Sequence, residues 1–493
     1  MAAMPVDGGR RACLLAGLGL ALPAARAATA WSPEGKWGAT AGTPDNRVQV
    51  GLEIEPSPAG LQAFLTIDLL NFFRMPLPGL KPDGDDRWTI PAYEVVLIRA
   101  ADHIRVSGVL DDEIELSRVA SIPRPPKPLP ARAGPAPLWR VGLGGPIYAP
   151  TAVHGEFGYV GNADGVMIAV DLRDGQPVWS FAAGRAIHGE ALATGDAVYF
   201  ACDNGQLYKL DRATGKETWR YALGDAGISR VLPNPLVFDY DHAAPRPTLV
   251  DGTLYVGSAD GSMHAVDAAR GERRWRFQAE GKVRGSAAVR GDTLVFGTVG
   301  SRLYALDRAS GAQRWRHETR GPVTGSPVFA GEHFIVGHRG SRLEALLPGQ
   351  SQPLWSQPYW GSWIESSAVI EDGVGYIGSG DLFLVSAFHP GSGRNLWRTR
   401  VGGWVLQRPA VNERFVYVSM SGARRRPKHF LPQASGLMAL ERTSGRIAWH
   451  WSAPSLPGSF MHGVVAAPAL AGPRIVVGAL DGSLYAFPEL NRR

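Results

Sequence analysis

Short hydrophobic runs, separated by polar residues and glycine, recur along most of the chain. The stretch 285–315 is typical, because two β-rich runs at 293–297 and 302–306 are separated by Val299-Gly300 and preceded by Gly291-Asp292. Short β-rich runs bounded by turn residues predict β-strands, and Gly and Asp are typical of tight turns. The same plan recurs up to the C-terminal residues. The pattern therefore predicts an all-β protein built from groups of four short strands.

A nine-residue signature, Asp-x-x-x-Gly-x-x-x-Trp, ends the groups. Clear copies end at Trp179, Trp219, Trp275 and Trp315, and weaker copies end at Trp355, Trp397 and Trp449. Trp139 is followed by the sequence expected after a signature Trp but lacks the upstream half of the signature. These tryptophans lie 40 to 56 residues apart. A strand-rich period near 40 predicts a β-propeller. We assign all eight a structural role, since a buried Trp removes roughly 150–250 Å² of surface from water.

The two ends of the repeat region complement each other. The last repeat ends at 482–487 without an outer Trp strand, whereas Trp139 has no repeat in front of it. We therefore expect residues 138–141 to complete the last blade, so that the ring has eight blades. Pairing the N-terminal and C-terminal strands would also remove exposed sheet edges.

Two repeats carry a recognisable longer motif. Ala169-Val-Asp171-Leu-Arg-Asp-Gly175 and Leu210-Asp211-Arg-Ala-Thr214-Gly215-Lys-Glu-Thr-Trp219 resemble Ala-x-Asp-x-x-Thr-Gly-x-x-x-Trp, the tryptophan-docking motif of pyrroloquinoline-quinone-type (PQQ-like) β-propeller repeats. The resemblance covers about residues 138–487. It implies an eight-bladed PQQ-like propeller but no particular activity. The family includes periplasmic quinoprotein alcohol dehydrogenases and the non-catalytic propeller lipoprotein of the outer-membrane β-barrel assembly machinery.

The N-terminal residues indicate export. Residues 1–27 have the form of a signal peptide, with Arg10-Arg11 before an apolar run and Ala25-Arg26-Ala27 as a cleavage site. The paired arginines allow the Tat route, and Sec remains open. Eleven apolar residues are too few to span a bilayer. We expect a periplasmic protein without a transmembrane span, whose formal charge falls from +6 to +4 on cleavage and does not favour nucleic acid.

Two further regions precede the propeller. Residues 28–121 alternate as strands do and predict a small separate β domain, in which 72–80 is expected to be an apolar loop, either buried or in contact with a partner or lipid. Residues 122–137 are rich in proline and predict a semi-rigid linker. The propeller is expected at 138–490. The mature chain would keep only Cys202, which cannot form an intramolecular disulfide and is expected to be a small buried residue.

One face of the ring is the candidate for function. Both long insertions, 222–250 and 421–435, fall on this face, and insertions gathered on one face commonly mark a binding surface. The segments that enter the inner strands there carry aromatic and charged residues where a typical repeat has small ones. The candidate ligand- or partner-binding residues of this funnel are His188, Glu190, Arg230, Arg284, Trp363, Glu365, Trp404, Gln407 and His462.

These residues allow two interpretations. Aromatic walls with a few polar groups suit a ligand site. Alternatively, the side chains fill the channel and pair with one another, Arg284 with Glu365 for example. The basic loop of Arg424, Arg425, Arg426 and Lys428 could attract an acidic partner, a lipid headgroup or a glycan, or be simply solvated. Asp239, Asp241 and His242 are only weak candidates for metal ligands, and we assign no metal site.

Two functions remain open. The first is a non-catalytic periplasmic binding or scaffold propeller, with an envelope protein or a small ligand on the funnel face. The alternative is an oxidoreductase that uses PQQ or another small ligand, with Trp363 or Trp404 as a stacking floor, Arg284 as a carboxylate clamp and Glu190 or Glu365 as a base. The resembled dehydrogenases use a vicinal Cys-Cys disulfide and a Ca²⁺ site. Because Cys202 is alone and no Ca²⁺ ligand set is evident, we assign no catalytic residue and no cofactor, and oligomeric state stays open.

Overall fold

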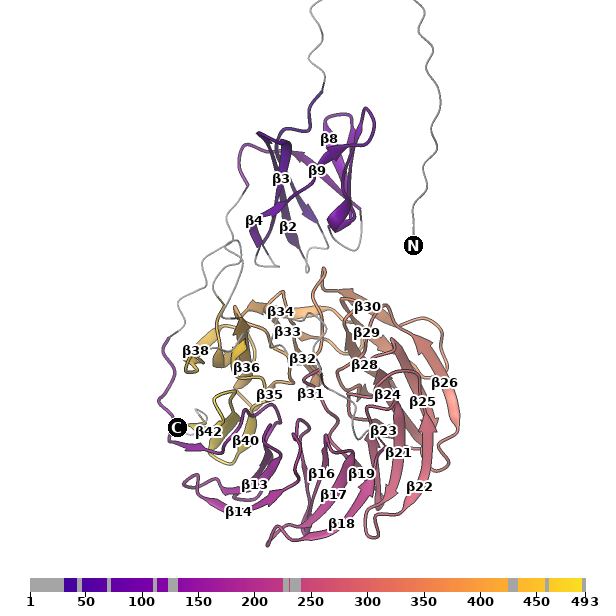
Figure 1. Cartoon of the computed structure of the whole chain (residues 1–493), viewed down its shortest axis with the longest axis vertical. Helices are drawn as coiled ribbons and strands as arrows, with labels where there is room; N and C mark the ends of the chain where they lie inside the picture. The colour runs from indigo at the N-terminus through magenta and orange to yellow at the C-terminus, as the bar shows by residue number, and fades with distance from the viewer. Residues whose placement is uncertain are drawn as a thin grey trace, which may run out of the picture.

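The computed structural model describes residues 31–41, 47–68, 72–109, 113–122, 132–224, 230, 241–423, 433–456 and 461–489. They form one curled nine-stranded sheet and eight smaller sheets arranged as the blades of a ring (Figure 1). The prediction of an all-β, eight-bladed propeller preceded by a separate β domain is confirmed. Within these ranges, no helix has the length and hydrophobicity that crossing a bilayer requires. The expected signal peptide and residues 123–131 of the expected linker lie outside them.

The N-terminal sheet is antiparallel, with the strand order β4-β3-β2-β1-β9-β8-β7-β6-β5, so that pairing of β1 with β9 joins two meanders. Trp37, Leu52, Ile104 and Leu116 are buried in its core. Its elements are β1 (Gly35–Ala41), β2 (Val48–Ser57), β3 (Gly60–Ile67), β4 (Phe72–Leu77), β5 (Lys81–Pro82), β6 (Arg87–Ile90), the 3-10 helix η1 (Pro91–Tyr93), β7 (Val95–Ala100), β8 (His103–Ser107) and β9 (Ile114–Arg118).

The expected apolar loop at 72–80 is in part wrong. Residues 72–77 form the edge strand β4, in which Met75 pairs with Leu65 and Leu77 pairs with Ala63 of β3. The turn-like residues Pro76 and Gly79 suggested a loop, but an edge strand tolerates proline because one side of its backbone needs no sheet partner.

The blades are numbered here in ring order. Blade 1 combines β10 (Trp139–Gly142) with β40 (Ala469–Ala471), β41 (Arg474–Gly478) and β42 (Ser483–Pro488). Blades 2 to 4 are β11 (Ala152–His154), β12 (Phe157–Gly161), β13 (Val166–Asp171) and β14 (Pro177–Ala182); β15 (Leu192–Ala193), β16 (Ala197–Cys202), β17 (Gln206–Asp211) and β18 (Glu217–Ala222); and β19 (Thr248–Val250), β20 (Thr253–Gly257), β21 (Ser262–Asp267) and β22 (Arg273–Gln278).

The remaining blades follow the same plan. Blades 5 to 8 are β23 (Ala288–Arg290), β24 (Thr293–Thr298), β25 (Arg302–Asp307) and β26 (Gln313–Glu318); β27 (Val328–Ala330), β28 (His333–His338), β29 (Arg342–Leu346) and β30 (Trp355–Pro358); β31 (Val369–Glu371), β32 (Val374–Gly378), β33 (Leu384–Phe388) and β34 (Asn395–Arg400); and β35 (Ala410–Val411), β36 (Phe415–Ala423), β37 (Gly436–Glu441) and β38 (Ile447–Ser452). The short β39 (Met461–Gly463) pairs with the end of β36.

The ring closes as predicted. Strand β10 pairs antiparallel with β42, with Trp139 opposite Ala486 and Gly142 opposite Ser483. The first propeller strand thus completes the sheet that contains the last one.

The signature residues lie at the contacts between blades. Trp179 Nε1 donates to the carbonyl of Arg212 in the next blade at 3.0 Å, and the same contact is made by Trp139, Trp275, Trp315, Trp355 and Trp397. The indole nitrogens of Trp219 and Trp449 have no acceptor among the described residues. The signature glycine lies under the ring: a Cβ on Gly215, whose φ is +71°, would come within 2.6 Å of Trp179.

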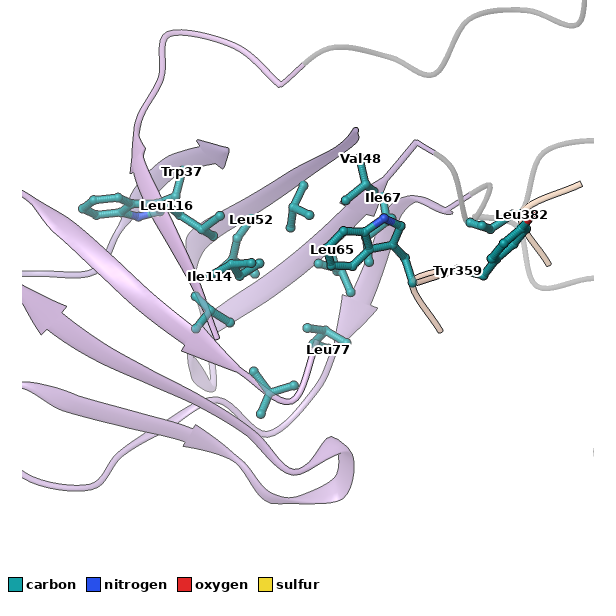
Figure 2. Close-up of a cluster of buried hydrophobic side chains, with 14 of the residues drawn as sticks. Trp37, Val48, Leu52, Leu65, Ile67, Leu77, Ile114, Leu116, Tyr359 and Leu382 are labelled. Carbon is teal, nitrogen blue, oxygen red and sulfur yellow. The ribbon is translucent and has the colours of Figure 1, made fainter. Parts of the chain in front are cut away.

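The N-terminal sheet packs against blades 6 and 7. Figure 2 shows Leu65 and Ile67 of the sheet beside Tyr359 and Leu382 of the propeller, and all four belong to one buried cluster. Arg400 Nη1 also donates to the carbonyl of Asp68. This contact places the N-terminal sheet at the ring face where the outer strands end, which is the face of the predicted funnel.

Candidate functional site at the channel mouth

The segments that enter the inner strands share one register. In six of the eight segments, an apolar residue packs on a glycine of the preceding blade, as Ile187 packs on Gly161 and Val283 on Gly257. The backbone repeats the contact, since Ile187 N donates to Asn162 O and Val283 N to Ser258 O. The next residue of each segment therefore lies at the same height around the channel. We call these residues the upper ring: Tyr148, His188, Arg284, Thr324, Glu365 and Leu406.

Blades 3 to 5 hold a cationic cluster, which we define as Arg230, Lys282 and Arg284 with the carboxylates of Asp203 and Asp241. Arg230 Nη2 donates to Asp203 Oδ1 at 2.8 Å, and Arg230 Nη1 donates to Ala243 O at 2.7 Å. Burial opposes ionisation of Asp203, but His188 and Arg230 outweigh it and lower the pKa of this carboxyl. Burial also lowers the pKa of His188, whose Nδ1 lies 3.1 Å from the Asp203 carboxylate.

Asp241 is the second anion of this cluster. Its Oδ2 accepts a hydrogen bond from Arg284 Nη2 and lies 3.3 Å from Lys282 Nζ. Burial opposes ionisation, yet Arg284 and the other cations lower the pKa of Asp241. The expected pair between Arg284 and Glu365 does not form, because the insertion before β19 supplies Asp241 as the partner of Arg284. The described residues contain no group of three ligands that could hold a metal ion, and Asp239 lies outside them.

Glu365 pairs with a residue of the neighbouring blade instead. Its Oε1 accepts hydrogen bonds from Arg339 Nε at 2.8 Å and Nη2 at 2.6 Å. The Arg339 guanidinium lies over the Trp363 ring, 4.5 Å from its centroid. A cation on an aromatic face is stabilised by the ring quadrupole. The face that Trp363 would offer to a ligand is thus in contact with the protein's own arginine.

Trp404 binds a carboxylate. Its Nε1 donates to Asp381 Oδ1 at 2.9 Å, while its backbone bridges Ser421 at the end of β36. Burial raises the pKa of Asp381; the Trp404 hydrogen bond opposes this rise and the charge of Glu365 adds to it. Asp381 lies deep among protein atoms and still keeps partial solvent access, as a residue in a channel wall does.

An ion pair crosses the channel two residues further along these segments. Arg408 Nη1 and Nη2 donate to Glu190 Oε2 and Oε1 at 2.6 and 3.0 Å, and Arg246 Nε lies 3.8 Å from Glu190. Burial lowers the pKa of Arg408, but the Glu190 carboxylate raises it by more, so the pKa of Arg408 is raised overall. Because Glu190 enters blade 3 and Arg408 enters blade 8, the pair joins blades that are not neighbours.

The other predicted residues are less central. Gln407 is half-buried and its carbonyl accepts a hydrogen bond from Ser366 Oγ at 3.0 Å. His462 lies in β39, opposite Gly422 of β36. Arg424, Arg425, Arg426 and Lys428 of the basic loop lie outside the described residues.

The sequence reasoning missed several residues of this site, three of them in turns. Asp203, Arg339 and Asp381 all lie in the turn between the second and third strands of their blades. These turns meet the channel at the same end as the segments before the inner strands. Comparing the turns of successive repeats in register would have shown Asp203 and Arg339 in place of Ala163 and Val299.

The matches to known proteins concern the propeller. Residues 132–232, 228–363 and 354–491 match the family model described as "Outer membrane protein assembly factor BamB". No curated protein matches the chain.

Solved structures show similar propellers. Quinohemoprotein alcohol dehydrogenase from Comamonas testosteroni has a TM-score of 0.52 at 14% identity, over 73% of this chain and 77% of that chain. The alcohol dehydrogenase ADHIIG from Pseudomonas putida HK5 has 0.53 at 13% identity, over 73% and 76%. The computationally designed Ika8 protein has 0.53 at 14%, over 70% and 97%. At these identities the likeness shows the fold alone.

Proposed function

Because this chain belongs to the protein family described as outer membrane protein assembly factor BamB, we propose that it is a non-catalytic binding propeller of the periplasm. Its funnel face would bind a protein of the cell envelope. The name of the family supports an envelope partner, and the arrangement of the funnel face supports binding without chemistry.

One observation carries the proposal: the charged groups at the channel mouth are engaged with one another. Arg230 binds Asp203, Arg284 binds Asp241, and Arg339 binds Glu365. Buried ion pairs of this kind rigidify the side chains that form them. A catalytic acid or base must instead reach a bound substrate. The mouth of the channel is therefore better suited to present a rigid binding surface than to catalyse a reaction.

Additional structure gathers on the same face. Residues 230 and 241–247 lie between β18 and β19, the end of β36 extends to pair with β39, and Arg400 at the end of β34 binds the N-terminal sheet. Insertions that collect on one face of a repeat protein commonly form its binding surface. The funnel face is thus broader and more irregular than a ring of simple repeats would make it.

The residues present do not fit a quinone as the resembled dehydrogenases hold it. The two cysteines, Cys13 and Cys202, are not adjacent and cannot form a vicinal disulfide ring. Trp363 is covered on one face by Arg339. His242, from the insertion before β19, is buried beside the arginines of the channel mouth, and the neighbouring Asp241 is half-buried. We therefore derive no reaction step through a quinone.

A crosslinking experiment tests the binding face. A photoreactive amino acid would replace Arg185 or Arg320, which are exposed on the funnel face, or Asp292 or Glu332, which are exposed in turns at the opposite end of the blades. In cells that produce the protein natively, we expect adducts with envelope proteins from the first pair only. Equal adducts from both faces would contradict a one-faced binding surface.

A cofactor titration tests the non-catalytic part of the proposal. PQQ, with and without Ca²⁺, would be added to the purified mature protein while absorbance and melting temperature are followed. We expect no saturable change in absorbance and no alcohol oxidation. A saturable absorbance shift, together with alcohol oxidation, would overturn the proposal in favour of the oxidoreductase.

Export can be tested separately. Cell fractionation of the full chain and of a variant without residues 1–27 should place the first in the periplasm and the second in the cytoplasm. Retention of the full chain in the cytoplasm would contradict the periplasmic location.

A further inference from the structure

Arg284 and Thr324 are equivalent residues on neighbouring blades. The segments that carry them touch: a Cβ on Gly285 would lie 2.5 Å from the carbonyl oxygen of Gly325. One position further on, Ser286 N donates to Ser326 Oγ at 2.9 Å. Because both segments share the register of the upper ring, residues 284 and 324 lie side by side at the channel mouth.

Both side chains hold a buried polar atom without a partner among the described residues. Arg284 is 4% exposed; its Nη2 donates to Asp241, but its Nε has no acceptor in the described part of the chain. Thr324 is 7% exposed, and its Oγ1 likewise has no hydrogen-bond partner there. A buried donor without an acceptor is costly. Two such donors at adjacent positions of one ring indicate that an acceptor binds between them.

The charge around this position favours an anion. The cationic cluster contains three cations, Arg230, Lys282 and Arg284, and two carboxylates, Asp203 and Asp241. Burial lowers the pKa of the neighbouring His188 and so disfavours its charged form. The cluster therefore contains one more cation than carboxylates, which favours an anion near it. A bound water would satisfy the two donors but would leave this charge in place.

We propose that Arg284 and Thr324 bind one small oxyanion, a carboxylate or a phosphate, at the mouth of the channel. Arg284 Nε donates to one oxygen of the anion, and Thr324 Oγ1 donates to another. A guanidinium suits this role, because its planar donors match the oxygens of carboxylates and phosphates. This site goes beyond the proposed partner-binding face, and it does not require a protein partner.

The test uses the full mature protein and two probes, acetate and inorganic phosphate. Melting temperature and titration calorimetry would be followed at constant ionic strength, with sodium chloride as the reference salt. We expect one of the probes to bind saturably at a single site. The preferred probe decides whether the oxyanion is a carboxylate or a phosphate. No saturable binding beyond the chloride reference in either arm would overturn the proposal.

A pair of matched variants locates the site. Thr324→Val removes the hydroxyl with little change in shape, and we expect it to weaken binding of the preferred probe about tenfold. Thr151→Val is the control, because Thr151 is 2% exposed with an unpartnered Oγ1 and lies in blade 2, away from the cationic cluster. Wild-type affinity in Thr324→Val, or an equal loss in Thr151→Val, would overturn the assignment.

A third variant tests the role of Arg284 while keeping its positive charge. Arg284→Lys keeps the cation near Asp241 but removes Nε, so we expect a further loss of affinity with the fold retained. Retained wild-type affinity would contradict the role of Nε. The crosslinking of envelope proteins is a separate readout: if Thr324→Val loses anion binding but keeps its crosslinks, both conclusions stand independently.

Discussion

Arg408 and Glu190 bind each other across the propeller channel through two hydrogen bonds, at 2.6 and 3.0 Å. The two residues are 218 positions apart and come from blades 8 and 3. Most contacts in a propeller join neighbouring blades, so this pair connects two arcs of the ring directly. A bidentate guanidinium–carboxylate pair also fixes the orientation of both side chains. The pair should therefore stabilise the closed ring and the channel mouth.

Removing Arg408 should be costly because Glu190 would stay buried without its main partner. We expect Arg408→Met to lower the free energy of unfolding by about 2–4 kcal/mol, measured by urea unfolding. As a control, Arg474→Met affects a pair in which Glu156 is 57% exposed and the charged atoms are 3.7 Å apart. This change should cost less than about 1 kcal/mol. If the losses of unfolding free energy in Arg408→Met and Glu190→Gln simply add in the double mutant, the two residues are not coupled and the ion pair does not stabilise the ring.

The contact between the signature glycine and tryptophan can be isolated with two glycines of blade 7. Gly393 and Gly373 have φ of +70° and +73°; a Cβ on Gly393 would lie 2.6 Å from Trp355, whereas a Cβ on Gly373 meets nothing within 4 Å. Alanine at either position pays the left-handed backbone cost of about 1–2 kcal/mol. We expect Gly393→Ala to cost roughly 1–3 kcal/mol more in chemical unfolding. Equal losses for the two variants would argue against a structural role of the signature.

The N-terminal sheet should unfold together with the propeller. Leu382 is fully buried in the cluster that contains Ile67 and Leu65, and it directly follows Asp381 of the channel wall (Figure 2). We expect Leu382→Ala to lower stability by about 2–5 kcal/mol and to split one calorimetric transition into two. Leu354→Ala is the control, since Leu354 is 49% exposed. If Leu382→Ala unfolds in one transition at a lower temperature, the contact around Leu382 does not couple unfolding of the N-terminal sheet to unfolding of the propeller.

Stability should fall on mild acidification because of His264. Burial lowers the pKa of His264 to about 4 from an ordinary value of 6.5, with Asp260 opposing and Arg276 adding to the shift. The folded state then binds fewer protons than the unfolded state between these values. The stability due to neutral His264 is complete above about pH 6.5 and is lost as pH falls towards 4, by up to about 3 kcal/mol.

Urea unfolding of His264→Gln and of His389→Gln between pH 7 and 4 checks this prediction. His389 is exposed and serves as the control. The slope of stability with pH should become flatter in His264→Gln alone. A change in His264→Gln that is independent of pH would show that the residue acts through Tyr221 and Ser258, its neighbours at 3.1 and 3.3 Å, and not through its titration.

The repeat architecture could be predicted from the sequence because its causes are local. Short β-rich runs define the strands, Gly and Asp define the turns, and tryptophans at a nearly constant interval show how strands are grouped. The incomplete repeats at Trp139 and at 482–487 even indicated how the ring closes, which the pairing of β10 with β42 confirms. These features depend on residues close together in the chain.

The funnel face could be located by the same reasoning, but its chemistry could not. The segments before the inner strands lie at the same end of the ring, because the propeller repeats their position in every blade. Which charges meet there depends on residues from distant segments. Arg284 binds Asp241 of an insertion and Glu365 binds Arg339 of the preceding blade, in place of the pair expected between them.

The sequence by itself therefore determined the class of fold, the number of blades and the face that carries the unusual residues. The tertiary structure alone decided the partner of each charged group, the ion pair between Glu190 and Arg408, and the packing of the N-terminal sheet on blades 6 and 7. The physical reason is the range of the interactions. Strand alternation and turn conformation are set within a few residues, whereas ion pairs and buried contacts select their partners by closeness in space.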